Sequence, residues 1–237
     1  MSSNYSTLFR FAVNNMIFLK GQVPIGAGQD RVVYLDPSHR GRCVKITRIN
    51  FKRDFKPVGF NETVYWLSRA GQTKYFDFNY VDVRYAQSLA KRKSPYSFTH
   101  IPFCYGYVET DLGVGVAWDY ITNDDGSSCK SLKDYDDNPH ILGEKEKQLL
   151  WQGLESFFAW QIQQNIMLRE MAYSNTLVRE EKDGTFKLYH IDAIGCADLI
   201  PLAKYSELVA RLRIRSKVRR FRKRMVAWLG EPQNVMN

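Results

Sequence analysis

The sequence predicts an α+β fold in two parts, on three observations. Short strand-like runs rich in Val, Ile and Tyr fill the first half of the chain, with Gly, Pro, Asp and Ser between them. The polar stretch "NDDGSSCKSLKDYDDNP" ends this pattern, and apolar residues then recur at helical spacing. Strands followed by helices favour α+β over an alternating parallel sheet. We therefore expect a first part over residues 1–122 and a second over residues 123–237.

The first part is predicted to be a small antiparallel sheet with one helix. The runs "MIFLKGQVPIG", "RVVYLD" and "RCVKITRI" give three short strands separated by turn residues. "NETVYWLSRAG" (61–71) has helical spacing and ends on a glycine. Residues 72–99 are predicted as a helix plus a long loop. "IPFCYGYVET" and "GVGVAWDYIT" add two strands joined by a tight turn at Asp111–Gly113.

The second part is predicted to be mostly helical, with one β-hairpin. "EKEKQLLWQGLESFFAWQIQQNI" is a long amphipathic helix. "NTLVREEKDGTFKLYHIDAIG" is a hairpin whose turn signal is Asp183-Gly184. The C-terminal segment "RLRIRSKVRRFRKRMVAWLG" has helical apolar spacing, at Ile214, Val218, Phe221, Met225 and either Trp228 or Leu229.

Composition indicates a folded cytoplasmic protein. Of 237 residues, 44% are hydrophobic and 14% aromatic, enough for a sizeable core. No run reaches the roughly 18 apolar residues of a membrane helix, and the N-terminus lacks a secretory pattern. The four cysteines lack the spacing of a zinc site or a disulfide scaffold, so we expect free thiols; they are Cys43, Cys104, Cys129 and Cys196.

The net charge of +9 is concentrated in one element. Arg211 to Arg224 contains nine Lys or Arg residues and no acid, so the rest of the chain is close to neutral. A uniformly basic nucleic-acid binder is not expected from this distribution. Two alternatives remain for the segment: a terminal helix with a solvated basic face, or a surface that attracts anionic lipid, lipopolysaccharide or nucleic acid.

Two features of the first part could serve phosphate binding. Gly26 and Gly28 form a GxG turn between strands, which lets backbone N–H groups approach phosphate oxygens, although Arg31 stands where a third glycine would fall. Lys45 lies on the following strand and could bind phosphate if a carboxylate held it, with Glu62 as the candidate. The alternatives are a plain tight turn, a solvated strand lysine and an ordinary helix-surface glutamate.

The second part holds an acid and an amide at fixed spacing. In "NIMLREMAYSNTLV" Glu170 precedes Asn175 by five residues, and apolar runs anchor both ends of the loop. "YHIDAIG" places Asp192 after an apolar strand, where Asp-x-x-Gly alone is a common turn. With Asn175, Asp192 could hold Mg²⁺ through oxygen ligands.

The order of these residues favours a protein-kinase-like two-lobed fold. A glycine turn, a strand lysine, a helix glutamate, an interlobe boundary, an acid-x4-Asn loop, a hairpin and an aspartate occur in the series that protein kinases have. The chain also resembles the YrbL-type family of bacterial proteins named for the PhoP regulatory network. The resemblance covers about residues 25–224 and is most specific in "VETDLGVG", "DDGSSCKSL" and "IPLAKYS", with 72–99 as an insertion.

The resemblance implies a kinase-like protein that binds ATP and Mg²⁺ in the bacterial cytoplasm. The implied roles are phosphate covering by Gly26 and Gly28, phosphate holding by Lys45 with Glu62, metal binding by Asn175 and Asp192, and the catalytic-base position for Glu170.

The chain departs from the kinase pattern at several positions. Leu168 replaces the loop histidine, Ala172 replaces a lysine, "DAIG" replaces "DFG", and no "APE" segment is visible. Two functions therefore remain open: a phosphotransferase acting on an unidentified hydroxyl acceptor, or a pseudokinase binding module without turnover.

Overall fold

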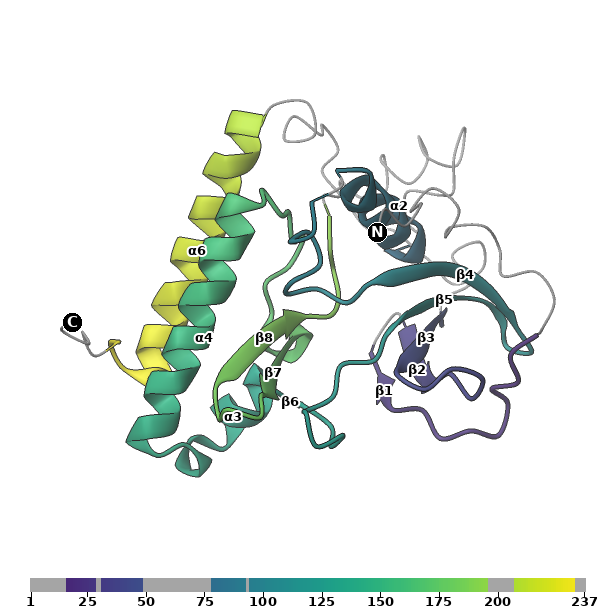
Figure 1. The fold of residues 1–237 in the computed structure, drawn as a ribbon, viewed down its shortest axis with the longest axis horizontal. Helices are drawn as coiled ribbons and strands as arrows, with labels where there is room; N and C mark the ends of the chain where they lie inside the picture. The colour runs from purple at the N-terminus through teal and green to yellow at the C-terminus, as the bar shows by residue number, and fades with distance from the viewer. Residues whose placement is uncertain (1–15, 29–30, 49–77, 93, 196–206, 233–237) are drawn as a thin grey trace, which may run out of the picture. The chain divides into compact units, whose positions relative to one another are not determined.

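The computed structural model describes residues 16–28, 31–48, 78–92, 94–195 and 207–232, and the chain forms two compact units (Figure 1). Unit 1 comprises described residues of 1–93 and 103–120, and unit 2 those of 94–102 and 121–237. The main division, after Tyr120, falls close to the boundary expected at 122. The short segment 94–102 belongs to unit 2, although it lies within the part of the sequence assigned to the first lobe.

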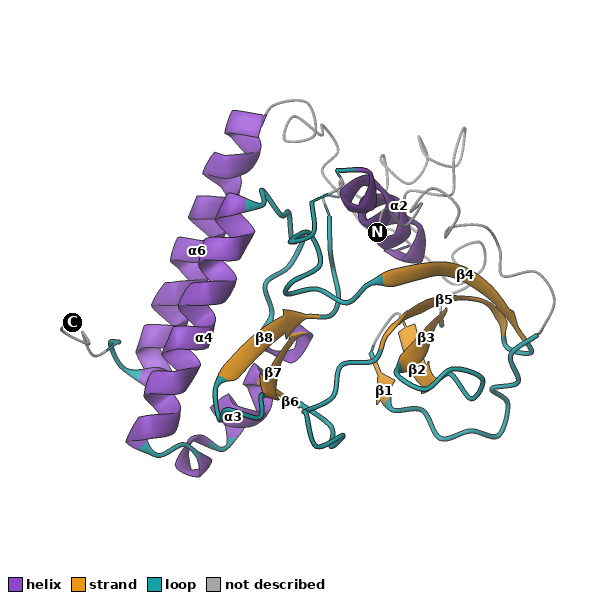
Figure 2. Ribbon diagram, viewed as in Figure 1, coloured by secondary structure: helices purple, strands orange, loops and turns teal. Residues whose placement is uncertain are grey.

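Unit 1 contains a five-stranded antiparallel sheet in the order β1-β2-β3-β5-β4 (Figure 2). Its strands are β1 (Gly26–Ala27), β2 (Arg31–Leu35), β3 (Arg42–Thr47), β4 (Cys104–Thr110) and β5 (Gly113–Asp119). The predicted turn at Asp111–Gly113 joins β4 to β5, and Gly113 has a φ of 105°, a conformation that favours glycine. The antiparallel sheet predicted for the first part is confirmed.

The first expected strand is much shorter than predicted. Of "MIFLKGQVPIG" only the last residue, Gly26, belongs to a strand, the two-residue β1, and Ile17 makes an isolated bridge to Thr110. The carboxylate of Asp111 accepts the backbone N–H of Leu19 at 2.6 Å and therefore satisfies a donor that a strand partner would otherwise take. Of the apolar residues there, Ile17 and Leu19 are buried in the core, whereas Met16, Phe18 and Val23 are exposed.

Helix α2 (Phe78–Lys91) packs on β4 and β5 in unit 1. It buries Val83, Ala86 and Leu89, which recur at helical spacing on one side. The helix expected within 72–99 is therefore present. The helix predicted over 61–71 lies outside the described residues.

Unit 2 combines a three-stranded sheet, β6-β7-β8, with two long helices. In chain order its elements are β6 (Lys130–Ser131), α3 (Leu132–Asp137), η3 (Pro139–Ile141), α4 (Glu144–Gln163), η4 (Tyr173–Asn175), β7 (Thr176–Glu180), β8 (Phe186–His190) and α6 (Glu207–Leu229). The long helix and the β7–β8 hairpin are as predicted, with Gly184 at a φ of 79° in the turn. The predicted α+β class is thus confirmed.

Helix α4 lies close against the hairpin. At Gly153 an added Cβ would come within 2.5 Å of the backbone oxygen of Phe186, so only glycine allows this approach. Segment 94–102 also docks in unit 2, because the His190 N–H donates to the carbonyl of His100 at 2.8 Å and the Trp160 indole donates to Tyr96 at 2.6 Å. The core of unit 2 therefore joins α4, the hairpin and a segment from earlier in the chain.

Helix α6 runs beside α4 (Figure 1). Its predicted apolar stripe is buried, and the rings of Phe221 and Phe158 meet edge to face at 5.9 Å. Of the two residues left open for the last position, Leu229 is buried and Trp228 is partly exposed. Across the described ranges, no helix is both long and apolar enough to cross a bilayer.

Three described cysteines are free thiols, as their scattered spacing predicted. Burial raises the pKa of Cys43 and Cys129 to about 11 and that of Cys104 to about 12, so these thiols stay protonated near neutral pH. Cys196 lies outside the described residues.

Candidate functional site

The glycine turn of unit 1 connects β1 to β2. Gly26 begins β1, and the N–H of Gly28 donates to the carbonyl of Arg31 at 2.9 Å. A Cβ added at Gly26 or Gly28 would meet its nearest atom at 3.9 Å or 3.8 Å, which is ordinary van der Waals contact. The described surroundings therefore do not themselves require glycine at either position.

Lys45 lies on the third strand and is buried, with 6% of its surface exposed. The alternative of a solvated strand lysine is therefore wrong. Its ammonium lies 5.3 Å from the centre of the Trp118 ring. The pKa of Lys45 is lowered to about 8, chiefly because burial disfavours the charged ammonium and also because Arg31 repels it, while Asp82 acts in the opposite direction. A buried lysine beside a carboxylate and an arginine has the character of a functional group more than of a surface residue.

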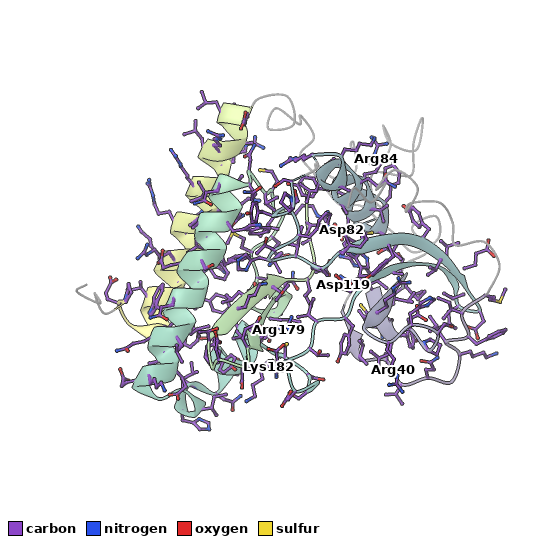
Figure 3. The ribbon with its side chains drawn as sticks, in the orientation of Figure 1. Arg40, Asp82, Arg84, Asp119, Arg179 and Lys182 are labelled. Atoms are coloured by element: carbon purple, nitrogen blue, oxygen red, sulfur yellow. The ribbon has the colours of Figure 1, made fainter. Side chains whose placement is uncertain are left out.

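A second charged group beside Lys45 was missed by the sequence reasoning. Asp82 lies on α2 (labelled in Figure 3) and is 1% exposed. Its carboxylate accepts a hydrogen bond from the Arg31 guanidinium at 2.7 Å. Asn79, one turn earlier, accepts from the same guanidinium at 3.2 Å and donates to the Thr47 hydroxyl at 2.9 Å. Because Thr47 and Lys45 alternate with Ile46 along β3, both project from the same face of the strand. Helix α2 thus brings a buried carboxylate to the Lys45 face.

Glu62, the carboxylate expected to partner Lys45, lies outside the described residues. The signal for Asp82 was present in "NYVDVRYAQSLA": Asn79, Asp82 and Ala86 recur at helical spacing on the side that carries Val83. Such a polar pair on an apolar helix face predicts a buried interaction, since unpaired charges are rarely buried.

In unit 2 the β7–β8 hairpin brings Asn175 and Asp192 together. Thr176 pairs with His190 at the end of the hairpin, and the N–H of Ile191 donates to the carbonyl of Asn175 at 2.9 Å. Asp192 is the next residue, and its carboxylate accepts the N–H of Ala193 at 2.6 Å. Ala193 has a φ of 53°, a left-handed conformation in which the chain turns directly after the aspartate. Two residues far apart in the sequence are therefore neighbours at one end of a hairpin.

The loop that carries Glu170 pairs with the residues after Asp192. The N–H of Arg169 donates to the carbonyl of Ala193 at 2.7 Å, and the N–H of Gly195 donates to Met167 at 2.8 Å. Leu168, which replaces a histidine of the kinase pattern, is fully buried. Glu170 itself is exposed at the tip of the pairing. This short antiparallel pairing couples the acid-x4-Asn loop to the aspartate.

Unit 2 therefore gathers Glu170, Asn175 and Asp192 by backbone pairing, while Gly26, Gly28 and Lys45 belong to unit 1. The donor set in unit 2 is one amide and one or two carboxylates, and hard cations such as Mg²⁺ prefer oxygen ligands of this kind. Within the part of the chain that the structure describes, no group of three or more His, Cys, Asp or Glu residues forms a metal cage. This donor set fits a magnesium ion that shares its coordination with phosphate and water, and no dedicated protein cage is needed.

The fold and these residues define a protein of the kinase-like class, with a lysine on the third strand of an antiparallel sheet and an acid-x4-Asn loop before a hairpin and an aspartate. More particularly, the family model described as PhoP regulatory network protein YrbL matches residues 17–226, and the chain belongs to that family. The family match includes residues 72–99.

Comparison with known proteins finds relatives of the same name. The chain is 27% identical over 192 residues to uncharacterized protein YrbL of Escherichia coli, a match that covers 81% of this chain and 80% of the relative. The same identity and coverage hold for uncharacterized protein YrbL of Shigella flexneri.

Among solved structures, the chain is similar to the PknI kinase domain of Mycobacterium tuberculosis. The wild-type domain matches with a TM-score of 0.39 and 16% identity, and a double mutant matches with 0.41 and 15%. These matches cover 72% of this chain and only 57% or 58% of the kinase-domain chains. A likeness at this level adds no argument about the site.

Proposed function

We propose that this protein binds ATP with Mg²⁺ and transfers the terminal phosphoryl group to a hydroxyl acceptor. The observation that carries the proposal is the convergence in unit 2: the hairpin places Asn175 beside Asp192, and the Glu170 loop pairs with the residues directly after Asp192. An oxygen-rich pair adjacent to an exposed carboxylate is the arrangement that phosphoryl transfer requires, because the protein mainly positions groups and neutralises charge.

Asn175 and Asp192 would hold the magnesium ion through side-chain oxygens. The ion, when bound, would neutralise charge on the phosphate oxygens. Backbone hydrogen bonds at the hairpin end, such as that from the Ile191 N–H to the Asn175 carbonyl, hold the main chain that carries these two residues.

Glu170 would accept the proton of the acceptor hydroxyl. The hydroxyl oxygen forms a bond to the γ-phosphorus, the bond to the bridging oxygen breaks, ADP leaves with that electron pair, and the carboxylate takes the proton. Glutamate is one methylene longer than aspartate and has the same acceptor chemistry, and its exposure leaves room for a substrate.

Lys45 would bind phosphate oxygens as a cation. Burial makes the charged form of Lys45 less favourable and lowers its pKa to about 8. An anionic ligand next to the ammonium would stabilise the charged form. Asp82 and Arg31 form a buried ion pair near Lys45, and their two charges would set the electrostatic potential at its ammonium.

Gly26 and Gly28 would allow the backbone to approach the phosphates. Their local surroundings do not require glycine, so a close approach by a ligand gives a physical reason for the absence of side chains there.

A pseudokinase that binds nucleotide without turnover is the second candidate. Its supporting observation is that Leu168, where the kinase pattern has histidine, is fully buried and serves the core of unit 2. In this alternative Asn175, Asp192 and Lys45 keep their binding roles and Glu170 has no base function.

The test combines calorimetric binding of Mg–ATP with a single-turnover assay using γ-labelled ATP. The proposal expects magnesium-dependent binding by the wild type and phosphate release or self-labelling. Glu170→Gln is expected to keep binding within about twofold and to lower turnover by about a hundredfold or more, the usual weight of a general base. Asp183→Asn is the matched control, because it removes a carboxylate at the opposite end of the same hairpin. Binding without wild-type turnover would favour the pseudokinase, and absence of binding would exclude both.

We also propose that the outer face of α6 contacts an anionic surface such as lipid or lipopolysaccharide. Leu208 and Leu212 are 69% and 57% exposed near the start of the helix, and exposed arginines follow at Arg215 and Arg219. Exposed apolar residues next to cations on a helix are typical of interfacial binding. Flotation with anionic and neutral liposomes tests this, and equal flotation with both would refute it.

A further inference from the structure

Three residues of α6 face the acid-x4-Asn loop of unit 2. Lys217, Phe221 and Arg224 are spaced by four and three residues, so they lie on one side of the helix. Lys217 is partly buried, and Arg224 is exposed, as are Arg219, Arg220 and Lys223 of the same helix. The basic helix therefore has a loop-facing stripe, formed by Lys217, Phe221 and Arg224, in addition to cations that face solvent.

Lys217 binds the backbone directly before Glu170. Its ammonium donates to the carbonyl oxygens of Leu168 at 2.5 Å and of Arg169 at 2.9 Å. A charged donor shared by two consecutive carbonyls makes short, charge-assisted hydrogen bonds, which are stronger than neutral ones. The ammonium thus fixes the chain on the N-terminal side of the acid.

Arg224 binds the backbone directly after Glu170. Its guanidinium donates to the carbonyl of Met171 at 2.7 Å and lies 5.3 Å from the centre of the Tyr173 ring. The same tyrosine ring meets Phe221 edge to face at 5.3 Å. The second cation and the aromatic contact fix the chain on the C-terminal side of the acid, up to the helical turn that ends in Asn175.

The opposite edge of the loop pairs with the residues after Asp192. Arg169 donates to the carbonyl of Ala193 through its N–H and to that of Ile194 through its guanidinium, at 2.7 Å and 2.6 Å. The loop is therefore held on one edge by backbone pairing and on the other by two cations from α6. Glu170 lies between the carbonyls that the two cations bind.

We propose that Lys217 and Arg224 are positioning residues that hold the Glu170 loop in its working geometry. The inference rests on the proposed function for its catalytic consequence, whereas the clamp itself is a statement about the loop backbone. It gives two of the nine basic residues of Arg211–Arg224 a role that is separate from attraction of an anionic surface. It also couples the C-terminal helix to the candidate site.

The experiment compares Lys217→Met and Arg224→Met with Lys223→Met and Arg220→Met. Each control removes the same type of charge from the exposed face of the same helix, so helix propensity and net charge change equally. Lys217→Arg is the conservative variant, because a guanidinium can still donate to two carbonyls. Hydrogen–deuterium exchange of a peptide spanning 167–175 reports on the loop without any ligand, and kcat and KM for Mg–ATP report on its catalytic use.

We expect exchange across 167–175 to accelerate about tenfold in Lys217→Met and Arg224→Met, because strong hydrogen bonds to the backbone are lost. The controls should exchange like the wild type, and protection of α4 should be unchanged in all variants. The kcat should fall about tenfold or more with KM for Mg–ATP within about twofold, since the hairpin hydrogen bonds still hold Asn175 beside Asp192 while the acid shifts. Lys217→Arg should restore most of the protection from exchange across 167–175 and most of the kcat.

Equal exchange across 167–175 in Lys217→Met and Lys223→Met would overturn the clamp. Accelerated exchange throughout unit 2 would also overturn it, because the residues would then stabilise the fold as a whole. If the wild type fails to bind Mg–ATP, the proposed function fails, and the exchange comparison still decides whether the clamp exists. If the wild type turns over and the Met variants keep full kcat, the loop does not need the clamp for catalysis.

Discussion

Protonation of Lys45 gives the most specific prediction, because its ammonium is buried. If Lys45 binds phosphate oxygens, only its charged form does so, and the apparent affinity for nucleotide follows the fraction of charged lysine. The pKa of Lys45 is lowered to about 8, so this fraction falls as the pH rises through 8. Affinity for Mg–ATP should therefore weaken with increasing pH in a range where ordinary lysines remain charged.

The magnitude follows from the pKa. With a pKa of about 8 in the free protein, roughly three quarters of Lys45 is charged at pH 7.5 and roughly one tenth at pH 9, so the affinity should fall about eightfold. The two buried thiols near Lys45 do not titrate in this range, because burial raises the pKa of Cys43 to about 11 and that of Cys104 to about 12.

Calorimetry with a non-hydrolysable ATP analogue and excess Mg²⁺ measures this affinity at pH 7.5, 8.0, 8.5 and 9.0. Lys45→Arg is the matched control, because a guanidinium keeps its charge over the whole range and should show a flat profile. A wild-type affinity that stays constant up to pH 9 would refute the assignment of Lys45 to the phosphates. So would an equal decline in Lys45→Arg.

Three further predictions concern the carboxylates and the glycine turn. Asp192→Asn should weaken Mg–ATP binding at least tenfold and leave binding without metal unchanged, since a neutral amide is a poorer Mg²⁺ ligand; calorimetry with and without Mg²⁺ checks this, and an equal loss in both would count against a metal role. Asp82→Ala should lower the free energy of unfolding by about 3–5 kcal/mol in urea, because the Arg31 guanidinium would remain buried without its carboxylate; a loss below about 1 kcal/mol would mean that the pair is not buried as described. Gly28→Ala should leave the urea midpoint unchanged, because the new Cβ meets only ordinary contacts, and should weaken Mg–ATP binding; unaltered binding would indicate a plain turn.

The elements that were predicted correctly are those whose structure is determined by their own residues. The β7–β8 hairpin and the turn before Gly113 followed from short-range turn chemistry, and α4 and α6 from apolar spacing. The strand expected from Met16 was overestimated, because only Ile17 and Leu19 are buried in the core and Ile17 makes a single isolated bridge instead of pairing along a neighbouring strand. Whether such a segment forms a strand depends on its tertiary contacts, which local propensity does not include.

The candidate site was predictable only in part. The spacing of Glu170 and Asn175 marked one loop, and the hairpin around Asp183-Gly184 brings Asp192 to it, so the unit 2 residues followed from local pattern. The Arg31–Asp82 pair joins residues 51 apart in the chain, and no local pattern specifies which helix covers the Lys45 face. The loop-facing stripe of α6 was not predicted, because the sequence of a basic run does not show which of its cations bind the protein and which face solvent.

The most direct test of the central claim is a crystal structure with Mg²⁺ and a non-hydrolysable ATP analogue. We expect a metal ion with oxygens of Asn175 and Asp192 at about 2.1 Å and phosphate oxygens completing its shell. A nucleotide bound elsewhere on the protein, or a metal ion that neither Asn175 nor Asp192 contacts, would contradict it.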